Sequence, residues 1–105
     1  MMPSVERLAL RGSVGRIVLA VRPSGEGALV LNGLGEAEDG WAYQAWISNP
    51  GATSPSPAAL FSGRETVVPL ALPVPPGATL AVTLEPEAGS FAPTRTPKLS
   101  VERPA

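Results

Sequence analysis

The first residues in this sequence that could support catalysis are two closely spaced carboxylates. Glu85 and Glu87 flank Pro86, and a close pair of carboxylates is what glycosidase or aspartic protease chemistry requires. Residues two apart on an extended chain point to the same side, so the spacing permits such a pair. A simpler interpretation is that Glu85 ends a strand in solvent, and we therefore expect no catalytic role for the pair.

Two other kinds of polar segment could bind a ligand. Glu36, Glu38 and Asp39 form a small acidic loop that could hold Ca²⁺, but it lacks the alternate-residue ligand spacing of an EF-hand. Ser62-Gly63-Arg64 and Gly25-Glu26-Gly27 are short turns that lead into no helix, so they do not predict a phosphate site. We expect solvated loops at these places, with no metal and no cofactor.

Histidine and cysteine are both absent from the 105 residues. Their absence excludes a thiol nucleophile, a Ser-His-Asp triad, an imidazole acid or base, and a zinc site built from these residues. With no suitable carboxylate cluster either, the sequence predicts a protein that is not an enzyme.

Three aromatic residues lie close together at Trp41, Tyr43 and Trp46. Aromatic side chains on a strand can stack on sugar rings, as in carbohydrate-binding modules. They can equally anchor the core of a small sandwich, and we favour the core for Trp46 more strongly than for Trp41. A free-standing extracellular module that binds carbohydrate or cell wall is therefore the alternative function.

The charged residues exclude some classes of partner. Eight basic residues are scattered from Arg7 to Arg103, and the net charge is −1. Nucleic-acid binding depends on neutralising phosphates, so this distribution predicts no nucleic-acid partner. No apolar stretch approaches the roughly 20 residues of a membrane span, and from the first residues we expect no signal peptide. We expect contact with a membrane only through a helix that this sequence does not contain.

Proline and glycine divide the chain into short strands. The 13 prolines leave little room for helix interiors, and the 11 glycines recur between apolar runs. Alternation is clearest at 79–85, where Leu80, Val82 and Leu84 form one face. The opposite face is polar, with Thr83 and Glu85, which predicts a half-buried strand with a solvated outer side.

The remaining strands predict the fold. Trp41 to Ile47 carries a large aromatic residue on each face, which predicts a central strand, whereas Pro69 cannot donate to a ladder and predicts an edge strand. About seven or eight strands in all indicate a single domain over residues 1–105: an all-β, antiparallel, Ig-like β-sandwich. A partly open β-barrel is the alternative fold.

Several segments match, in order, the pattern of a known family. The pattern has a Leu before a loop, Tyr-Gln-Leu-Trp, a Leu-Phe segment, Val-Thr-Xaa-Glu-Pro, and Gly-Gly-Ser followed by Pro-Thr-Gly-Pro. The counterparts here are Leu34, Tyr43-Gln44-Ala45-Trp46, Ala59-Leu60-Phe61, Val82-Thr83-Leu84-Glu85-Pro86, Ala88-Gly89-Ser90 and Pro93-Thr94. Over about residues 14–101 the chain resembles the C-terminal, extracytoplasmic domain of RskA-type anti-sigma-K factors. It departs from the pattern at Glu87-Ala88 and at Arg95-Thr96-Pro97.

The resemblance implies a role in transcription regulation. Such proteins have a cytoplasmic segment that binds a sigma factor, one transmembrane helix and this outer domain on the far side of the bacterial membrane. Regulated proteolysis by a site-1-type protease releases the sigma factor. This chain would be the sensory or protease-gating part, and the doubled Met at its start suggests an excised fragment. The ligand or partner of the domain itself is not identified by the resemblance.

The resemblance also selects candidate residues, for structure or for interaction. They are Tyr43, Gln44, Trp46, Val82, Thr83, Glu85, Pro86, Gly89, Ser90, Pro93 and Thr94. For Glu85 we favour a structural role, in which its carboxylate accepts hydrogen bonds from backbone N–H groups of the 87–91 loop and holds that loop in place.

Overall fold

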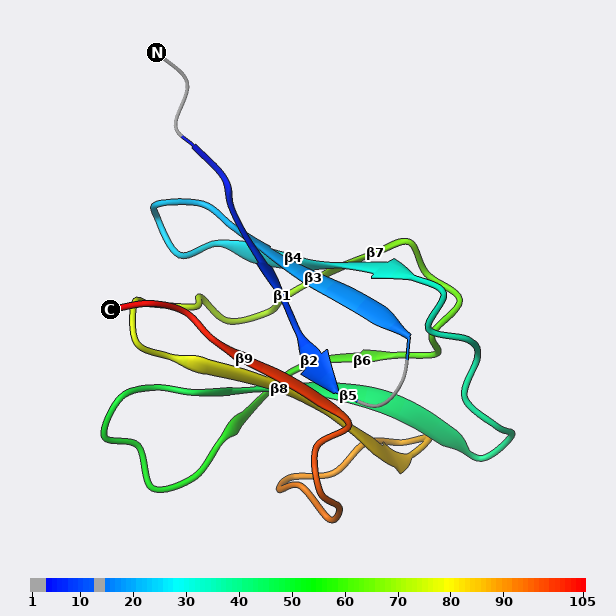
Figure 1. Ribbon diagram of the computed structural model, residues 1–105. Coiled ribbons are helices and arrows are strands. Elements are labelled where there is room, and N and C mark those ends of the chain that lie inside the picture. The colour runs from blue at the N-terminus through cyan, green and yellow to red at the C-terminus, as the bar shows by residue number, and fades with distance from the viewer. Residues whose placement is uncertain (1–3, 13–14) are drawn as a thin grey trace.

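The computed structural model describes residues 4–12 and 15–105, and the described residues form nine strands (Figure 1). The strands are β1 Glu6–Ala9, β2 Arg11–Gly12, β3 Arg16–Val21, β4 Gly27–Asn32, β5 Trp41–Ser48, β6 Ser56–Phe61, β7 Val67–Pro69, β8 Thr79–Pro86 and β9 Leu99–Glu102.

The strands make two antiparallel sheets. One has the order β1-β3-β4-β7, and the other has the order β2-β9-β8-β5-β6. Figure 1 shows the four-stranded sheet above the five-stranded one, with the core between them. The all-β, antiparallel sandwich is confirmed, and no closed barrel forms among the described strands.

The described residues form one or two more strands than the sequence predicts because the N-terminal segment crosses between the sheets. β1 pairs with β3 in one sheet, and β2 pairs with β9 in the other. Leu10 is buried at the crossing. Gly12 fits here because a Cβ on this residue would overlap the backbone carbonyl of Lys98. One extended segment therefore closes this side of the sandwich, in front in Figure 1.

Alternate residues of the strands fill the space between the sheets. Leu19 of β3 lies opposite Leu29 of β4, and both are fully buried. From the other sheet, Leu80 and Val82 of β8 are also fully buried in this core. Each buried aliphatic side chain of this size contributes about 1.5–3 kcal/mol. The core thus explains how a chain rich in proline and glycine folds without a disulfide.

Two strand predictions are confirmed. β5 is an inner strand, because it pairs with β8 on one side and β6 on the other. β7, which contains Pro69, is an edge strand that pairs only with β4 in its sheet.

The prediction of a solvated outer face on β8 is wrong. Thr83 and Glu85 point away from the core between the sheets, yet both are 0% exposed. The reason is tertiary: the segment 87–98, orange at the bottom of Figure 1, folds back over this face and bonds to it. We call this segment the 87–98 loop.

Candidate functional site: a loop held by a buried carboxylate

The carboxylate of Glu85 is the centre of the polar contacts beneath the 87–98 loop. Its Oε1 accepts hydrogen bonds from Ser90 Oγ at 2.8 Å and from Thr94 Oγ1 at 2.6 Å. Its Oε2 accepts from Thr83 Oγ1 at 2.7 Å and from the Thr94 backbone N–H at 3.1 Å. Four donors from strand and loop thus converge on one buried group.

These donors keep Glu85 ionised. Burial on its own raises the pKa of this carboxyl, but the hydrogen bonds from Thr94, Thr83 and Ser90 outweigh burial and hold the pKa below its ordinary value of 4.5. Such bonds favour the charged form because they are made to the carboxylate oxygens. Glu85 is therefore an anion stabilised by hydroxyl and amide groups.

A second pair of contacts attaches the same loop to β5. The side-chain amide of Gln44 donates to the Ser90 carbonyl at 3.0 Å and accepts from the Ser90 N–H at 2.9 Å. On the same outer face of the sheet, the Trp46 indole N–H donates to Thr83 Oγ1 at 2.8 Å. The Thr83 hydroxyl in turn donates to Glu85, which connects Trp46 to the carboxylate. No buried side-chain nitrogen or oxygen in the described part of the chain lacks a partner. The network is complete, which favours rigidity.

The structure brings six of the eleven candidate residues into this network. They are Gln44, Trp46, Thr83, Glu85, Ser90 and Thr94. Pro86 and Gly89 shape the turn into the loop: the Gly89 N–H donates to the Pro86 carbonyl at 2.8 Å, and Gly89 has a positive φ of 84°.

The other three candidates do not join the network. Tyr43 and Val82 face the core between the sheets, and Pro93 is half-buried in the loop. Trp46 is buried, but on the face of the five-stranded sheet that points away from that core.

The donors to Glu85 differ from those we expected. Hydroxyl groups supply three of the four bonds, and the one backbone N–H belongs to Thr94, beyond the 87–91 segment. The Ser90 N–H goes to Gln44 instead. Glu85 is also not one of a catalytic pair with Glu87, because Glu85 is buried and fully hydrogen-bonded whereas Glu87 is exposed. The arrangement holds a loop and offers no free base.

One loop contact was missed from the sequence. The guanidinium of Arg95 lies over the Trp41 ring, 4.4 Å from its centroid, a distance typical of a cation–π interaction. The sequence feature that pointed to this contact is the departure from the family pattern at Arg95. Because Arg95 covers the ring, that face of Trp41 is not open for stacking on a sugar.

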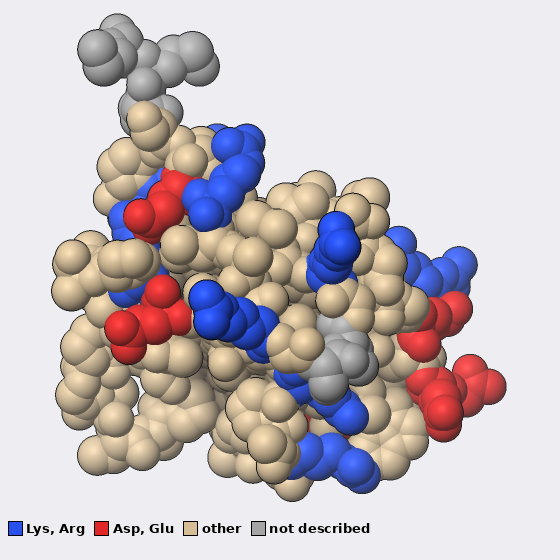
Figure 2. Space-filling view, in the orientation of Figure 1, with Lys and Arg blue, Asp and Glu red and all other residues tan. Residues whose placement is uncertain are grey.

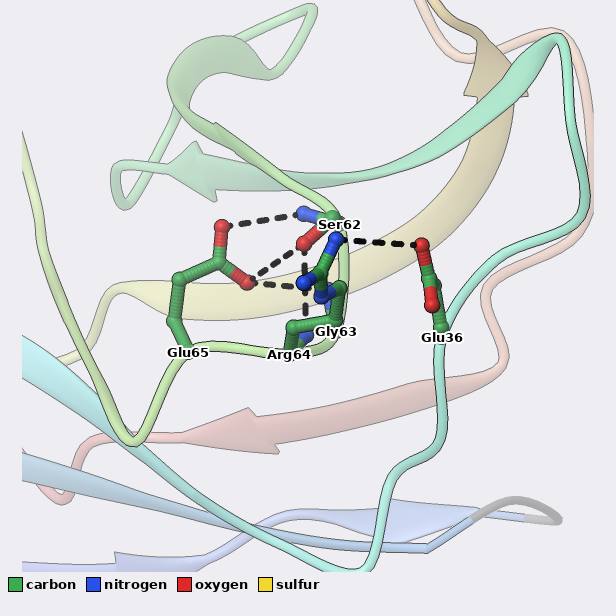
Figure 3. A network of polar contacts seen from close by, with 5 residues as sticks. All are labelled: Glu36, Ser62, Gly63, Arg64 and Glu65. Carbon is green, nitrogen blue, oxygen red and sulfur yellow. Dashed lines mark hydrogen bonds and ion pairs between the residues drawn. The ribbon is translucent and has the colours of Figure 1, made fainter.

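The turn Ser62-Gly63-Arg64 binds a carboxylate of its own chain (Figure 3). Glu65 accepts from the N–H groups of Ser62 at 3.1 Å and Gly63 at 2.9 Å, and from the Ser62 hydroxyl at 3.1 Å. The backbone donors that could hold an outside anion are thus occupied. Across the turn, Arg64 pairs with Glu36 at 3.6 Å, which ties down the acidic loop.

The acidic loop does not build a metal centre. Among residues 4–12 and 15–105, no group of three or more acidic, histidine or cysteine side chains is placed to hold a metal ion.

The stability of the protein should depend on pH through Glu85. Because its folded-state pKa is lowered, its ionised form stabilises the fold above the ordinary pKa of 4.5, and this contribution disappears as pH falls through the folded-state value. Replacing Glu85 with Gln removes this titration. In urea unfolding at a series of pH values, the gap in unfolding free energy between wild type and Glu85→Gln should be largest near neutral pH and shrink in acid. A constant gap would show that the charge of Glu85 is not what stabilises the loop.

The fold and this site define a class: a two-sheet β-sandwich domain whose outer face is covered by a loop that a buried carboxylate holds in place. A comparison with protein-family models matches residues 3–101 to the family described as anti-sigma-K factor rskA, C-terminal. The chain belongs to this family, which is one of transcription regulators and implies a sigma factor as partner.

Two further comparisons add nothing to this assignment. Neither the search of curated proteins nor the search of solved structures gave a significant match. The described residues contain no helix that is long and apolar enough to cross a membrane.

Proposed function

We propose that this chain is a single sensory or protease-gating domain on the extracytoplasmic side of a membrane-anchored anti-sigma factor. The family match over residues 3–101 supports this assignment. In the whole protein, a separate cytoplasmic segment binds the sigma factor and a transmembrane helix carries the domain. A site-1-type protease begins the release of the sigma factor, and the domain controls its access.

The observation that carries the gating role is the complete network around Glu85. A group with four donors and no free lone pair directed at solvent is suited to holding a conformation rather than to catalysis. The domain is therefore no enzyme in this proposal, and what it contributes is its folded stability. While it stays folded it shields the stalk that joins it to the membrane.

Stability can control cleavage in a graded way. When opening is fast relative to cleavage, the rate of proteolysis follows the population of the open form. Each 1.4 kcal/mol lost from the folded state then raises cleavage about tenfold. A ligand or partner that binds only the folded state lowers cleavage in proportion to its saturation. A signal can thus act by changing stability alone.

A cleavage assay on the membrane-anchored, full-length protein tests this role. Val82→Ala removes two methyl groups from a fully buried core residue, a loss of about 2 kcal/mol at about 0.8 kcal/mol per group with its cavity. Site-1 cleavage should rise about 30-fold if it follows stability. Glu85→Gln destabilises the domain from the opposite face of β8. It should raise the cleavage rate by the factor that its own loss of unfolding free energy predicts.

Phe91→Ala provides the matched control for this assay. Phe91 lies on the 87–98 loop but is 99% exposed, so its loss should change neither stability nor cleavage. If Val82→Ala leaves the cleavage rate unchanged while lowering stability, gating by the folded state is wrong. If Phe91→Ala changes the cleavage rate and Val82→Ala does not, the protease recognises the 87–98 loop directly, and gating by the folded state is wrong.

A further inference from the structure

The basic side chains that form no ion pair in the described part of the chain gather on one face. Three of the eight basic residues form ion pairs: Arg22 with Glu26, Arg64 with Glu36 and Arg103 with Glu6. The other five form none within the described part of the chain. These five, which we call the basic face, are Arg7, Arg11, Arg16, Arg95 and Lys98.

The crossing of the N-terminal segment brings these five residues together. β1 and β3 pair with Ala9 opposite Val18, and the Leu10 N–H donates to the Ile17 carbonyl. Arg11 and Arg16 are the residues next to Leu10 and Ile17 in this contact, so the crossing places both close to it. Arg11 also lies opposite Ser100 of β9, two residues from Lys98. Residues far apart in sequence thus form one band of positive charge.

Arg7 and Arg95 extend the basic face at its two ends. Arg7 lies four residues before Arg11 on the same N-terminal segment and pairs with Ala20 of β3. Arg95 lines a hollow together with Lys98. Figure 2 shows blue side chains across the face that carries β1, β2 and β9, with red side chains at its margins.

Most of the acidic residues gather at one end of the basic face, where Glu36 and Glu38 line the same hollow as Arg95 and Lys98. Five carboxylates line an adjoining hollow of about 440 Å³ beside Trp41: Glu36, Glu38, Asp39, Glu65 and Glu87. Glu102 of β9 is exposed at the margin of the basic face. The net charge of −1 thus combines a basic face with an acidic cluster that adjoins it only at the end formed by Arg95 and Lys98.

We propose that the basic face docks on the anionic headgroups of a phospholipid bilayer. This inference rests on the proposed function, which places the domain next to a membrane. A domain tethered to a membrane meets that surface at high local concentration. A Lys or Arg held near an anionic membrane contributes about 1 kcal/mol, and the attraction fades within about 10 Å at 0.1 M salt. Docking would hold the tethered domain against the membrane and restrict access to the stalk.

The surface fits a flat anionic partner better than a nucleic acid. Single-stranded nucleic acid is bound by aromatic side chains that stack on bases, and the Trp41 ring beside the basic face is covered by Arg95. An anionic strand entering the hollow next to Lys98 would also meet Glu36 and Glu38, which line its other side. A bilayer needs only an exposed band of charge.

Vesicle sedimentation with this chain tests the proposal. Vesicles of equal parts phosphatidylcholine and phosphatidylglycerol should bind the protein at about 50 mM salt and release it at about 500 mM, where screening is strong. Pure phosphatidylcholine vesicles should not bind it. Arg11→Gln/Arg16→Gln should weaken binding about 30-fold. Arg22→Gln/Arg64→Gln makes the same change in net charge away from the basic face, and it should weaken binding less than about threefold.

Each other outcome would overturn the proposal. No binding to anionic vesicles, equal binding to neutral vesicles, or equal loss in the two double variants would each exclude a docking face. Tighter binding to single-stranded DNA or RNA, with the same dependence on Arg11 and Arg16, would assign the face to nucleic acid. The vesicle assay needs no protease and no sigma factor. A failure to bind vesicles would therefore overturn the docking proposal without affecting the proposed function, which the cleavage assay tests separately.

Discussion

Replacing Glu85 with Ala is expected to lower the free energy of unfolding by about 3–5 kcal/mol. The substitution removes the acceptor for Thr83, Ser90 and the two Thr94 donors, and it leaves a space under the 87–98 loop. A buried donor left without a partner costs about 1–3 kcal/mol. For a domain of this size the melting temperature should fall by roughly 12–40 °C.

Glu85→Gln separates the charge of this residue from its shape. Its amide oxygen can still accept the Thr94 N–H, and the hydroxyls of Ser90 and Thr94 can rotate to accept from the amide nitrogen. The charge-assisted strength of the bonds is lost, so we expect a smaller decrease of about 1–2 kcal/mol. Calorimetry and urea unfolding measure both variants. An unchanged melting temperature in Glu85→Ala would mean that the network does not stabilise the fold and would favour a surface recognition role.

Trp46→Ala is expected to be at least as damaging, with a loss of about 3–5 kcal/mol. Trp46 is the largest fully buried side chain, at 1% exposed, so its removal leaves a large cavity on the outer face of the five-stranded sheet. The loss also deprives Thr83 Oγ1 of its donor at 2.8 Å. The effect should reach the loop through Thr83 and Glu85.

Trp46→Phe tests that connection. It keeps most of the buried ring but removes the indole N–H, so the Thr83 oxygen loses the bond that it accepts while its O–H still donates to Glu85. With the smaller side chain, we expect a loss of about 1–3 kcal/mol. Hydrogen exchange of the Thr94 amide reports on the loop. Faster exchange of this amide in Trp46→Phe would support a connected network. If exchange is unchanged in that variant while overall stability falls, Trp46 acts through packing alone.

The strand pattern was predictable because it depends on neighbours in sequence. Alternation along 79–85 indicated a strand, and Pro69 indicated an edge, since a residue without an N–H cannot serve an inner ladder. The burial of Thr83 and Glu85 was not predictable by the same rule. A polar side of a strand faces water unless another segment covers it, and that segment, the 87–98 loop, carries no periodic signal.

The candidate site was found by resemblance rather than by pattern. Order along the chain placed Gln44, Glu85 and Ser90 among the candidates, but it did not say which atoms would meet. Ser90 bonds to Gln44, 46 positions away, and Trp46 bonds to Thr83, 37 positions away. Hydrogen bonds at such separations depend on how the sheet and loop pack, and no local rule reports that.

The sequence by itself determined that this protein is a β domain without thiol or imidazole chemistry, because strand periodicity and residue types are local properties. Only the tertiary structure decided what the carboxylate of Glu85 and the basic residues do. Folding of the 87–98 loop adds three donors to the one that Thr83 supplies to the Glu85 carboxylate. The crossing of the N-terminal segment collects arginines that are scattered in sequence. Both results depend on contacts between distant segments, where the energies of burial and charge are set by the surroundings that the fold supplies.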